Sequence, residues 1–293
     1  MTEYQPGDIQ PGSSAAPISR REARRAEADA LIDSAGPAQP APVKRSLATK
    51  IVGVFGELLI TAGVFVLLFL GWQLWWNSIV LTNEQSSDAT SLADDWKLPV
   101  VTGTTPTPTP VSGDTAAPAN FGDPAVMGAP SVGSDFAILY VPRFGADFKR
   151  TVAEGVDPHT VLNKGGAGHY EDTQMPGEVG NFAIAAHRDG WGSAFIKINE
   201  LQIGDPVYVE TQDGWYTYRY RDTEYVTPYG VGVIDPIPQV QGGTAVDRLI
   251  TLTSCNPLYI ASERIIAYGA FESWQPRSAG PPAEIASVVG SGN

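Results

Sequence analysis

The feature that most constrains this chain is a long apolar stretch, Ile51 to Trp76, which contains a single charged residue, Glu57. As a helix rising about 1.5 Å per residue, this stretch exceeds the roughly 30 Å hydrocarbon core of a bilayer. A cleaved signal peptide is the alternative, but fifty residues precede the stretch and no small-residue cleavage site follows it. The sequence therefore predicts a single transmembrane anchor at 51–76. Tryptophans at its far end suit the membrane interface: Trp72, Trp75 and Trp76.

Charged residues on the two sides of the anchor predict its orientation. Lys44, Arg45 and Lys50 precede the anchor, and basic residues close to a span tend to stay in the cytoplasm. Acidic residues dominate the other side, where Lys97 alone opposes Glu84, Asp88, Asp94 and Asp95. We therefore expect a single-pass protein of the cell membrane with a cytoplasmic tail, 1–50, and an extracellular C-terminal part.

Two further segments flank the expected folded part. In the cytoplasmic tail, Ser19 and Glu22 have capping-box spacing, which predicts a short charged helix that runs to about Asp33. After the anchor, Thr and Pro alternate within Thr104–Pro110, which is typical of an extended polyproline II spacer. We expect an extracellular stalk over 77–134 and a flexible C-terminal tail over 276–293.

Short β-branched or aromatic runs, separated by turn residues, predict an all-β domain over 135–275. The chain has 24 prolines and 31 glycines, too many for a helical protein. One short helix is expected at Phe195–Leu201. Many short strands with few helices indicate a closed barrel or a sandwich. The predicted strands are Phe136–Val141, Phe182–Ala186, Pro206–Thr211, Trp215–Arg221, Leu249–Ser254 and Arg264–Phe271.

Charge composition excludes one class of partner. The chain has 19 Lys and Arg against 32 Asp and Glu, a net charge of −13. Nucleic acid phosphates need a basic surface, so we expect no nucleic acid partner. The glycines match neither a phosphate loop nor a dinucleotide fingerprint, and the three histidines lack metal-ligand spacing. We therefore expect no cofactor and no metal.

The only cysteine, Cys255, ends a predicted strand, and Asn256-Pro257 breaks that strand at once. One interpretation is a small buried hydrophobic residue. However, an exported protein with one cysteine cannot form an internal disulfide, so its thiol pairs with another chain or stays reactive. A reactive thiol needs a base or a positive neighbour, because a free thiol has a pKa of about 8.5.

His187 is the best-placed base. It ends a predicted core strand before a turn, as Cys255 does, so two strands of one sheet could bring the pair together at one rim. Arg264 opens the next strand, nine residues after Cys255, and its guanidinium could donate to an oxyanion or hold a substrate backbone. His169, in a glycine-rich segment, is a candidate for substrate contact. Tyr170 and the long loop Val226–Asp247 are candidates for selecting the substrate.

These residues resemble the sortase family, the membrane-anchored cysteine transpeptidases of Gram-positive bacteria. The most specific part is Thr251–Cys255 followed by Arg264. Sortases have Thr-Leu-x-Thr-Cys at this place, so Ser254 replaces the usual threonine and keeps its hydroxyl. Met175–Asn181, leading to Ala186-His187-Arg188, resembles the class E pattern, in which glycine usually precedes the histidine.

The resemblance implies an eight-stranded sortase-type β-barrel with one or two short helices. Cys255 would be the nucleophile, His187 the general acid and base, and Arg264 the oxyanion-binding or substrate-binding group. Such enzymes cut a C-terminal LPXTG or LAXTG sorting signal between Thr and Gly and hold the acyl group as a thioester. The acceptor is an amine of a lipid II-type cell-wall precursor or of a pilin lysine, so the implied partners are surface proteins or pilins with sorting signals. Candidate substrate contacts are Thr251, Ser254, Tyr170 and His169.

Three alternatives fit the sequence less well. A papain-like peptidase has its cysteine before the histidine and on a helix, the reverse of His187 and Cys255. An L,D-transpeptidase has a Cys-x-Arg signature, whereas Asn256 and Pro257 follow Cys255 here. An anchored wall-binding or pilus-assembly scaffold with a structural cysteine would bury Cys255 beyond the reach of thiol reagents.

Overall fold

The computed structural model describes residues 19–34, 46–72, 76–97 and 121–290 of the chain. The chain divides into two compact units, Met1–Ala62 and Gly63–Asn293. The flanking Lys44 and Arg45, Trp75, and the Thr/Pro spacer Thr104–Pro110 lie outside the described residues.

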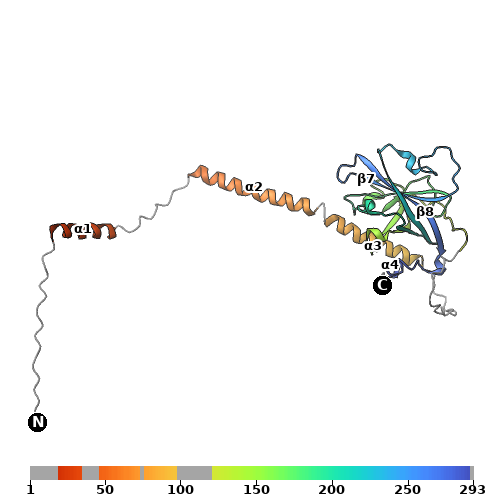
Figure 1. Ribbon diagram of the computed structural model, residues 1–293, viewed down its shortest axis with the longest axis horizontal. Helices are drawn as coiled ribbons and strands as arrows, with labels where there is room; N and C mark the ends of the chain where they lie inside the picture. Colours follow the sequence, from red (N-terminus) through yellow and green to blue (C-terminus); the bar gives the residue numbers. More distant parts are fainter. Residues whose placement is uncertain (1–18, 35–45, 73–75, 98–120, 291–293) are drawn as a thin grey trace, which may run out of the picture. The chain divides into compact units, whose positions relative to one another are not determined.

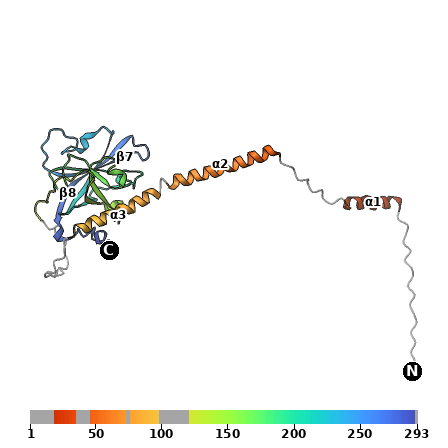
Figure 2. The same cartoon turned by 180° about the vertical axis from the view of Figure 1, so that it is seen from behind.

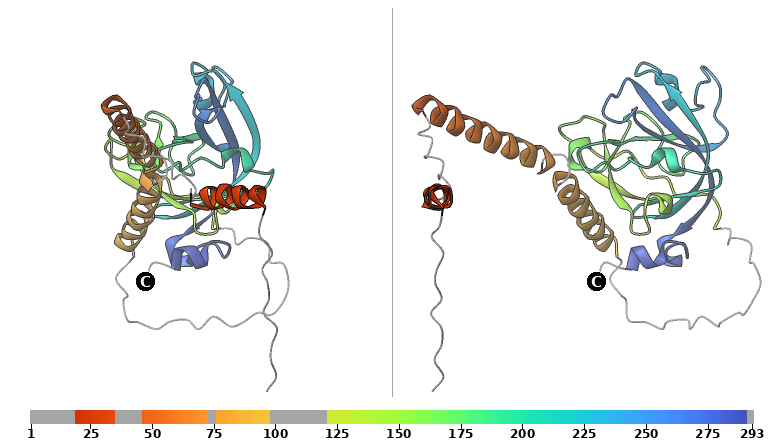
Figure 3. Two further views of the ribbon diagram at one scale, coloured as in Figure 1. Left: turned by 90° about the vertical axis from the view of Figure 1, so that its left-hand side faces the viewer. Right: turned by 60° about the vertical axis from the view of Figure 1, so that its left-hand side comes forward.

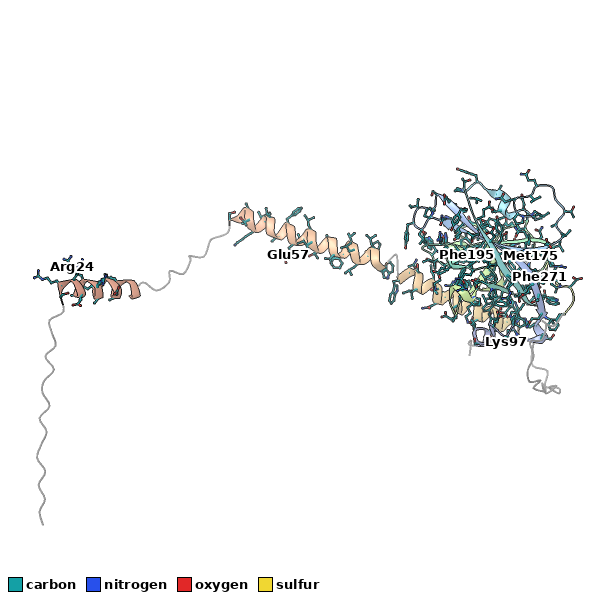
Figure 4. The ribbon with its side chains drawn as sticks, viewed as in Figure 1. Arg24, Glu57, Lys97, Met175, Phe195 and Phe271 are labelled. Atoms are coloured by element: carbon teal, nitrogen blue, oxygen red, sulfur yellow. The ribbon has the colours of Figure 1, made fainter. Side chains whose placement is uncertain are left out.

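Two helices begin the described chain (Figure 1). Helix α1, Arg20–Ser34, opens with the predicted capping box: the backbone N–H of Ser19 donates to Glu22 Oε2 at 3.0 Å, and that of Glu22 to Ser19 Oγ at 3.4 Å. Helix α2, Leu47–Gly71, is long and apolar enough to cross a membrane, and none of its residues is buried. Figure 4 labels its one acidic residue, Glu57, along this helix. The apolar helix that the sequence predicts is therefore present, shifted a few residues toward the N-terminus.

Eight strands close into a barrel in the order β1-β2-β3-β4-β7-β8-β6-β5 (Figures 1 and 2). Neighbouring strands run antiparallel, except that β2 pairs with β3, and β4 with β7, in parallel. This confirms the predicted eight-stranded barrel. The strands are β1 Asp135–Tyr140, β2 Lys149–Glu154, β3 Ala167–His169, β4 Gly180–Ala185, β5 Pro206–Glu210, β6 Gly214–Val226, β7 Arg248–Asn256 and β8 Glu263–Pro276.

The barrel interior is filled by alternate residues of each strand, as the period of two along a strand requires. From β7, Ile250 and Leu252 are buried in this core, and from β8, Ile265 and Ala267. Large side chains pack in or against this core, and Figure 4 labels three of them: Met175, Phe195 and Phe271. Thr251, Thr253 and Cys255 therefore alternate with the core residues of β7 and face outward.

Strands β2 and β3 were not predicted, because their sequences lack an apolar alternation. All six residues of β2 are nevertheless buried, including two cations, Lys149 and Arg150. Burial arises because helix α3, Asn77–Asp95, packs along β2, as Figure 3 shows. The polar side chains of α3 offer hydroxyl and amide partners to the polar residues of β2, whereas an apolar surface would offer none.

The chain at 77–95 therefore departs from the extended stalk predicted for 77–134. Gln85 of α3 is 4% exposed and lies at the centre of the contact. Its Oε1 accepts from the backbone N–H of Thr151 at 3.2 Å and from Thr151 Oγ1 at 3.0 Å, and its Nε2 donates to the Lys164 carbonyl at 3.1 Å. Farther along α3, Thr90 Oγ1 accepts from Lys149 Nζ at 2.7 Å. The polar composition of α3 thus suits docking to β2 rather than a solvated spacer.

The segment 121–134 also lies on the barrel, through backbone carbonyls. Tyr216 Oη donates to the Ala125 carbonyl at 2.7 Å, and Trp274 Nε1 to the Gly122 carbonyl at 3.1 Å. This part of the predicted stalk is an edge of the folded domain.

The C-terminal tail predicted for 276–293 is ordered through position 290. Ile285 is 1% exposed because it packs in a second apolar cluster with Tyr208 and Trp215, and the short helix α4, Ala286–Gly290, follows it. The predicted helix at Phe195–Leu201 is only a single 3-10 turn, η4, at Ile198–Glu200.

Replacing Gln85 with leucine should lower the free energy of unfolding of the barrel by about 2 kcal/mol, because the buried N–H and hydroxyl of Thr151 lose their acceptor. The matched control is Glu84→Leu on the exposed face of the same helix, which should stay within about 0.5 kcal/mol of wild type. Denaturant unfolding of the full chain in detergent, followed by tryptophan fluorescence, measures both. Equal losses in the two variants would show that α3 is not docked through Gln85.

Candidate active site

The end of β7 is held against the end of β4 by a continuous parallel ladder. Ala183 pairs with Thr251, and Ala185 with Thr253. Beyond the last pair, the backbone N–H of Ala186 donates to the Thr253 carbonyl at 3.2 Å. Because parallel strands advance together, the next outward-facing positions on the two strands are those of His187 and Cys255. The register therefore brings positions 187 and 255 to adjacent ends of β4 and β7.

Strand β8 lies on the other side of β7 and brings the third predicted residue. The antiparallel register pairs Cys255 directly with Arg264. Arg264 precedes the core residue Ile265, so it faces outward as Cys255 does. His187 just after β4, Cys255 near the end of β7 and Arg264 near the start of β8 thus lie at neighbouring ends of three adjacent strands, which we call the rim. Figure 1 labels the two neighbouring strands β7 and β8.

Cys255 is half-buried, so it is not sealed inside the core. A structural cysteine of the kind that a scaffold protein would have is expected to be fully buried. The position at the rim, open in part to solvent, suits a thiol that a substrate can reach.

His187 is held by a residue that the sequence analysis did not identify. The His187 Nε2–H donates to Asn163 Oδ1 at 2.8 Å, which fixes the ring and leaves Nδ1 as the proton acceptor of the neutral imidazole. Burial lowers the pKa of His187 below its ordinary value, and the nearby carboxylate of Asp189 opposes that shift. The imidazole is therefore neutral near pH 7. Asn163 lies 24 residues earlier in a short 3-10 turn, η3, Leu162–Lys164, and no sequence signal marks it.

Arg188 ties the two strand ends together. This side chain is 6% exposed and donates through Nη1 to Asn256 Oδ1 and, at 3.5 Å, to the Cys255 carbonyl. Its Nη2 donates to Asn199 Oδ1 at 3.0 Å. The arginine directly after His187 thus contacts the backbone carbonyl of Cys255 and the side chain of Asn256, the residue that follows it. Arg188 directly follows His187 in the sequence, but no role was predicted for it.

Arg264 and Tyr170 lie on the same side of Cys255. Arg264 Nη1 donates to two backbone carbonyls of its own loop, those of Ala261 and Glu263, at 3.1 and 2.8 Å. Within the part of the chain that the structure describes, it forms no ion pair. Tyr170 Oη bonds Thr253 Oγ1 at 2.9 Å, and burial raises the pKa of Tyr170, whereas that hydrogen bond and the charge of Arg264 lower it.

Two of the candidate substrate contacts are structural. Thr251 is 0% exposed and donates to Asn181 Oδ1 at 2.7 Å, while Ser254 is 4% exposed and donates to the Ala186 carbonyl at 2.7 Å. The Ser254 bond extends the β4–β7 contact past the ladder, toward His187. Both side chains therefore position the rim without facing a ligand.

His169 is also placed differently from expectation. It is 1% exposed, stacks on Phe182, and bonds Glu154 Oε2 through Nδ1 at 2.8 Å. Its Nε2 is engaged by Thr173 Oγ1 at 2.9 Å. The expectation that His169 contacts substrate is therefore wrong. The glycines around it resembled a loop, whereas the residue is packed in the core.

Two pockets flank the rim. The first, of about 150 Å³, has Tyr170, Thr253 and Arg264 on one side and residues of the Val226–Asp247 loop on the other. The loop residues are Val226, Thr227, Pro228, Gly230, Val231, Val233 and Ile234. Tyr170 and this loop, which were expected to select substrate, thus line one pocket together.

The second pocket, of about 800 Å³, has His187 in its wall. Residues of helix α3 and of the segment Asp189–Lys197 also line it, together with Arg150 of β2, Phe144, Phe148 and Tyr259. Cys255 is on β7. On one side β7 pairs with β4, which leads to His187 in this pocket, and on the other side it pairs with β8, which carries Arg264 of the first pocket. Among the described residues, no cluster of three or more His, Cys, Asp or Glu could hold a metal ion.

Comparison with known proteins agrees with this geometry. The sortase domain family matches residues 139–272. Sortase SrtE1 of Streptomyces coelicolor is 34% identical over 278 residues, which cover 93% of this chain and 68% of the relative. Sortase SrtE2 of the same organism is 34% identical over 76% of this chain and 83% of its own length.

A solved structure gives the same result. The SrtA sortase from Actinomyces oris superposes with a TM-score of 0.54 at 36% identity, covering 56% of this chain and 94% of its own. The similarity to relatives named sortase E agrees with the class E pattern around His187. Sortases are cysteine transpeptidases, and the chain belongs to the sortase family.

Proposed function

We propose that this chain is a membrane-anchored class E sortase that cleaves a sorting signal of LPXTG or LAXTG type between Thr and Gly and transfers the acyl group to an amine. The observation that supports this most is the strand register, which brings positions 187, 255 and 264 to the ends of three adjacent strands. The class E pattern favours the LAXTG signal, and the family accounts for LPXTG as the alternative.

The first half of the reaction uses the thiol. The neutral His187 accepts the Cys255 proton, and the sulfur attacks the carbonyl carbon of the signal's Thr. Arg264 donates hydrogen bonds to the developing oxyanion or to the substrate backbone. His187 then gives its proton to the departing Gly amine, the C–N bond breaks, and a thioester remains on Cys255.

The second half uses the acceptor amine. Its nitrogen attacks the thioester carbon, loses a proton to His187, and forms an amide as the C–S bond breaks. The sulfur leaves as a thiolate and recovers a proton from His187. An amine outcompetes water where the site is partly dry. A lipid II-type cell-wall precursor or a pilin lysine supplies such an amine, and the donor is a surface protein or a pilin.

The pocket beside Arg264 is the proposed site for the sorting signal. Its wall combines the Arg264 guanidinium, the Tyr170 phenol and apolar residues of the Val226–Asp247 loop. A short apolar residue of the signal fits an apolar pocket of about 150 Å³, while Arg264 holds the signal's backbone.

Location follows from α2 and its flanking charges. An apolar helix of 25 residues suits a membrane span. Lys44 and Arg45 precede it and Lys50 lies in its first turn, so the N-terminal tail is cytoplasmic and the barrel extracellular. An outward-facing enzyme meets substrates that are held in the same membrane.

The direct test incubates the full chain in detergent with a Leu-Ala-x-Thr-Gly peptide and an amine. Wild type should give peptide cleavage after Thr, an acyl adduct on Cys255 seen by intact-protein mass spectrometry, and an amide product. Cys255→Ala should give none of these, because the C–S bond cannot form. Cleavage that persists in Cys255→Ala, or an adduct on another residue, would contradict the proposal.

Donor cleavage should lose activity in acid with a midpoint below about pH 6.5, because burial lowers the pKa of His187 and only its neutral form accepts the thiol proton. Asp189→Asn should move this midpoint still lower, since the Asp189 carboxylate favours the protonated imidazole. The measurement is kcat/KM against pH for donor cleavage, with Asp213→Asn in the β5–β6 turn as the control. An upward shift in Asp189→Asn, or the same shift in Asp213→Asn, contradicts the assignment of the acid limb to His187.

A further inference from the structure

The wall of the larger pocket contains a buried cation that forms no ion pair with any residue that the structure describes. Arg150, on β2, is 7% exposed and lines the pocket. Its Nη1 donates to the Lys149 carbonyl at 2.8 Å, and its Nη2 reaches Thr82 Oγ1 at 3.3 Å. The buried Nε has no hydrogen-bond partner in the part of the chain that the structure describes. A buried guanidinium bonded only to neutral oxygens is an unfavourable arrangement unless a ligand completes it.

Arg150 remains charged in this position. Burial lowers its pKa to about 10, so the guanidinium is still a cation at neutral pH. It lies over the ring of Phe148, 4.9 Å from the ring centre, which fixes its plane at the pocket wall. No described carboxylate lies within ion-pair distance of it, and the nearest acidic influence is the exposed Asp147. Arg150 therefore offers an oriented positive charge to the pocket.

A negative charge, that of Asp189, lies elsewhere in the same wall. His187 and Asp189 lie together in the wall, on the segment that follows β4. The backbone N–H of Tyr259 donates to Asp189 Oδ2 at 2.5 Å, which holds this carboxylate at the rim. A carboxylate beside the imidazole attracts an ammonium group to the place where a proton must be removed. Apolar side chains join the two charged ends: Phe144, Phe148, Trp191 and Ile196.

We propose that this pocket binds the acceptor, and that the acceptor is a primary amine that also carries an oxyanion, a carboxylate or a phosphate, held by Arg150. The inference rests on the proposed transpeptidase function and adds the place and chemical class of the second substrate. Lys197, also in the wall, adds a second positive charge to the pocket. The sorting signal then occupies the pocket beside Arg264, and the two substrates approach Cys255 from opposite sides.

The test compares acceptors that differ only in the anion. The full chain in detergent receives a Leu-Ala-x-Thr-Gly peptide with glycylglycine or glycylglycine amide, and with aminoethyl phosphate or ethanolamine. Amide products are quantified by mass spectrometry. Wild type should use an anionic acceptor about tenfold better in kcat/KM than its neutral partner, the preference expected of one charge-assisted hydrogen-bonded contact. The two pairs separate a carboxylate ligand from a phosphate ligand, and equal use within both pairs would overturn the proposal.

The variant Arg150→Gln should reduce that preference to about one, while donor cleavage by water, measured without amine, keeps its wild-type rate. Arg150→Lys should recover part of the preference. The matched control is Lys149→Gln, which removes the adjacent buried cation of β2, a residue outside the pocket wall. A preference that survives in Arg150→Gln, or that is lost equally in Lys149→Gln, would overturn the assignment to Arg150.

Two further measurements keep the outcome clear. If Arg150→Gln does not fold, as judged by its thermal transition, Lys197→Gln replaces it and should lower the preference several-fold; an unchanged preference would count against the site. If no peptide is cleaved at all, the proposed function fails. The acceptor site is then decided separately by calorimetric binding of the four amines to Cys255→Ala, where tighter binding of the anionic amines supports it and equal binding overturns it.

Discussion

The pairing of β7 with a strand on each side is the constraint on which the site depends. Its parallel ladder with β4 and its antiparallel ladder with β8 bring the positions of His187, Cys255 and Arg264 to one rim. A shift of one residue in either register would turn one of the three side chains into the core. Ser254 and Arg188 hold the strand ends beyond the regular ladder, through bonds to the Ala186 and Cys255 carbonyls. The geometry of the rim is therefore set by backbone register and fixed by these polar contacts.

A second constraint is the polar strand β2. Its cations Lys149 and Arg150 are buried because α3 covers them, with hydroxyl and amide groups rather than carboxylates as partners. The same helix contributes wall residues to the large pocket beside His187. The segment that follows helix α2 is thus part of the folded domain and of a candidate substrate site. The packing of α3 that buries Arg150 also places it in the wall of the pocket.

The sequence predicted the parts of the fold whose residues follow a simple period. The six strands predicted from β-branched or aromatic residues are present. The candidates His187, Cys255 and Arg264 were chosen because each lies at the end of a predicted strand. The docked helix α3 was missed, because its residues are polar and its partner lies some sixty residues away on β2. His169 was misplaced for the opposite reason, since its Glu154 and Phe182 partners come from other strands. Local pattern therefore gave most of the strands and the candidate residues at their ends, while contacts between distant polar segments required the structure.

The most direct test of the central claim is a cross-link between β4 and β7. Adjacent strands lie about 4.8 Å apart, within the Cα separation that a disulfide accepts. In the full chain, the His187→Cys variant should therefore form an intramolecular disulfide with Cys255 under mild oxidation, seen as the loss of two free thiols and as one cross-linked peptide. Two thiols that stay free after oxidation, while both react with a small alkylating reagent, would show that positions 187 and 255 do not meet and would contradict the account.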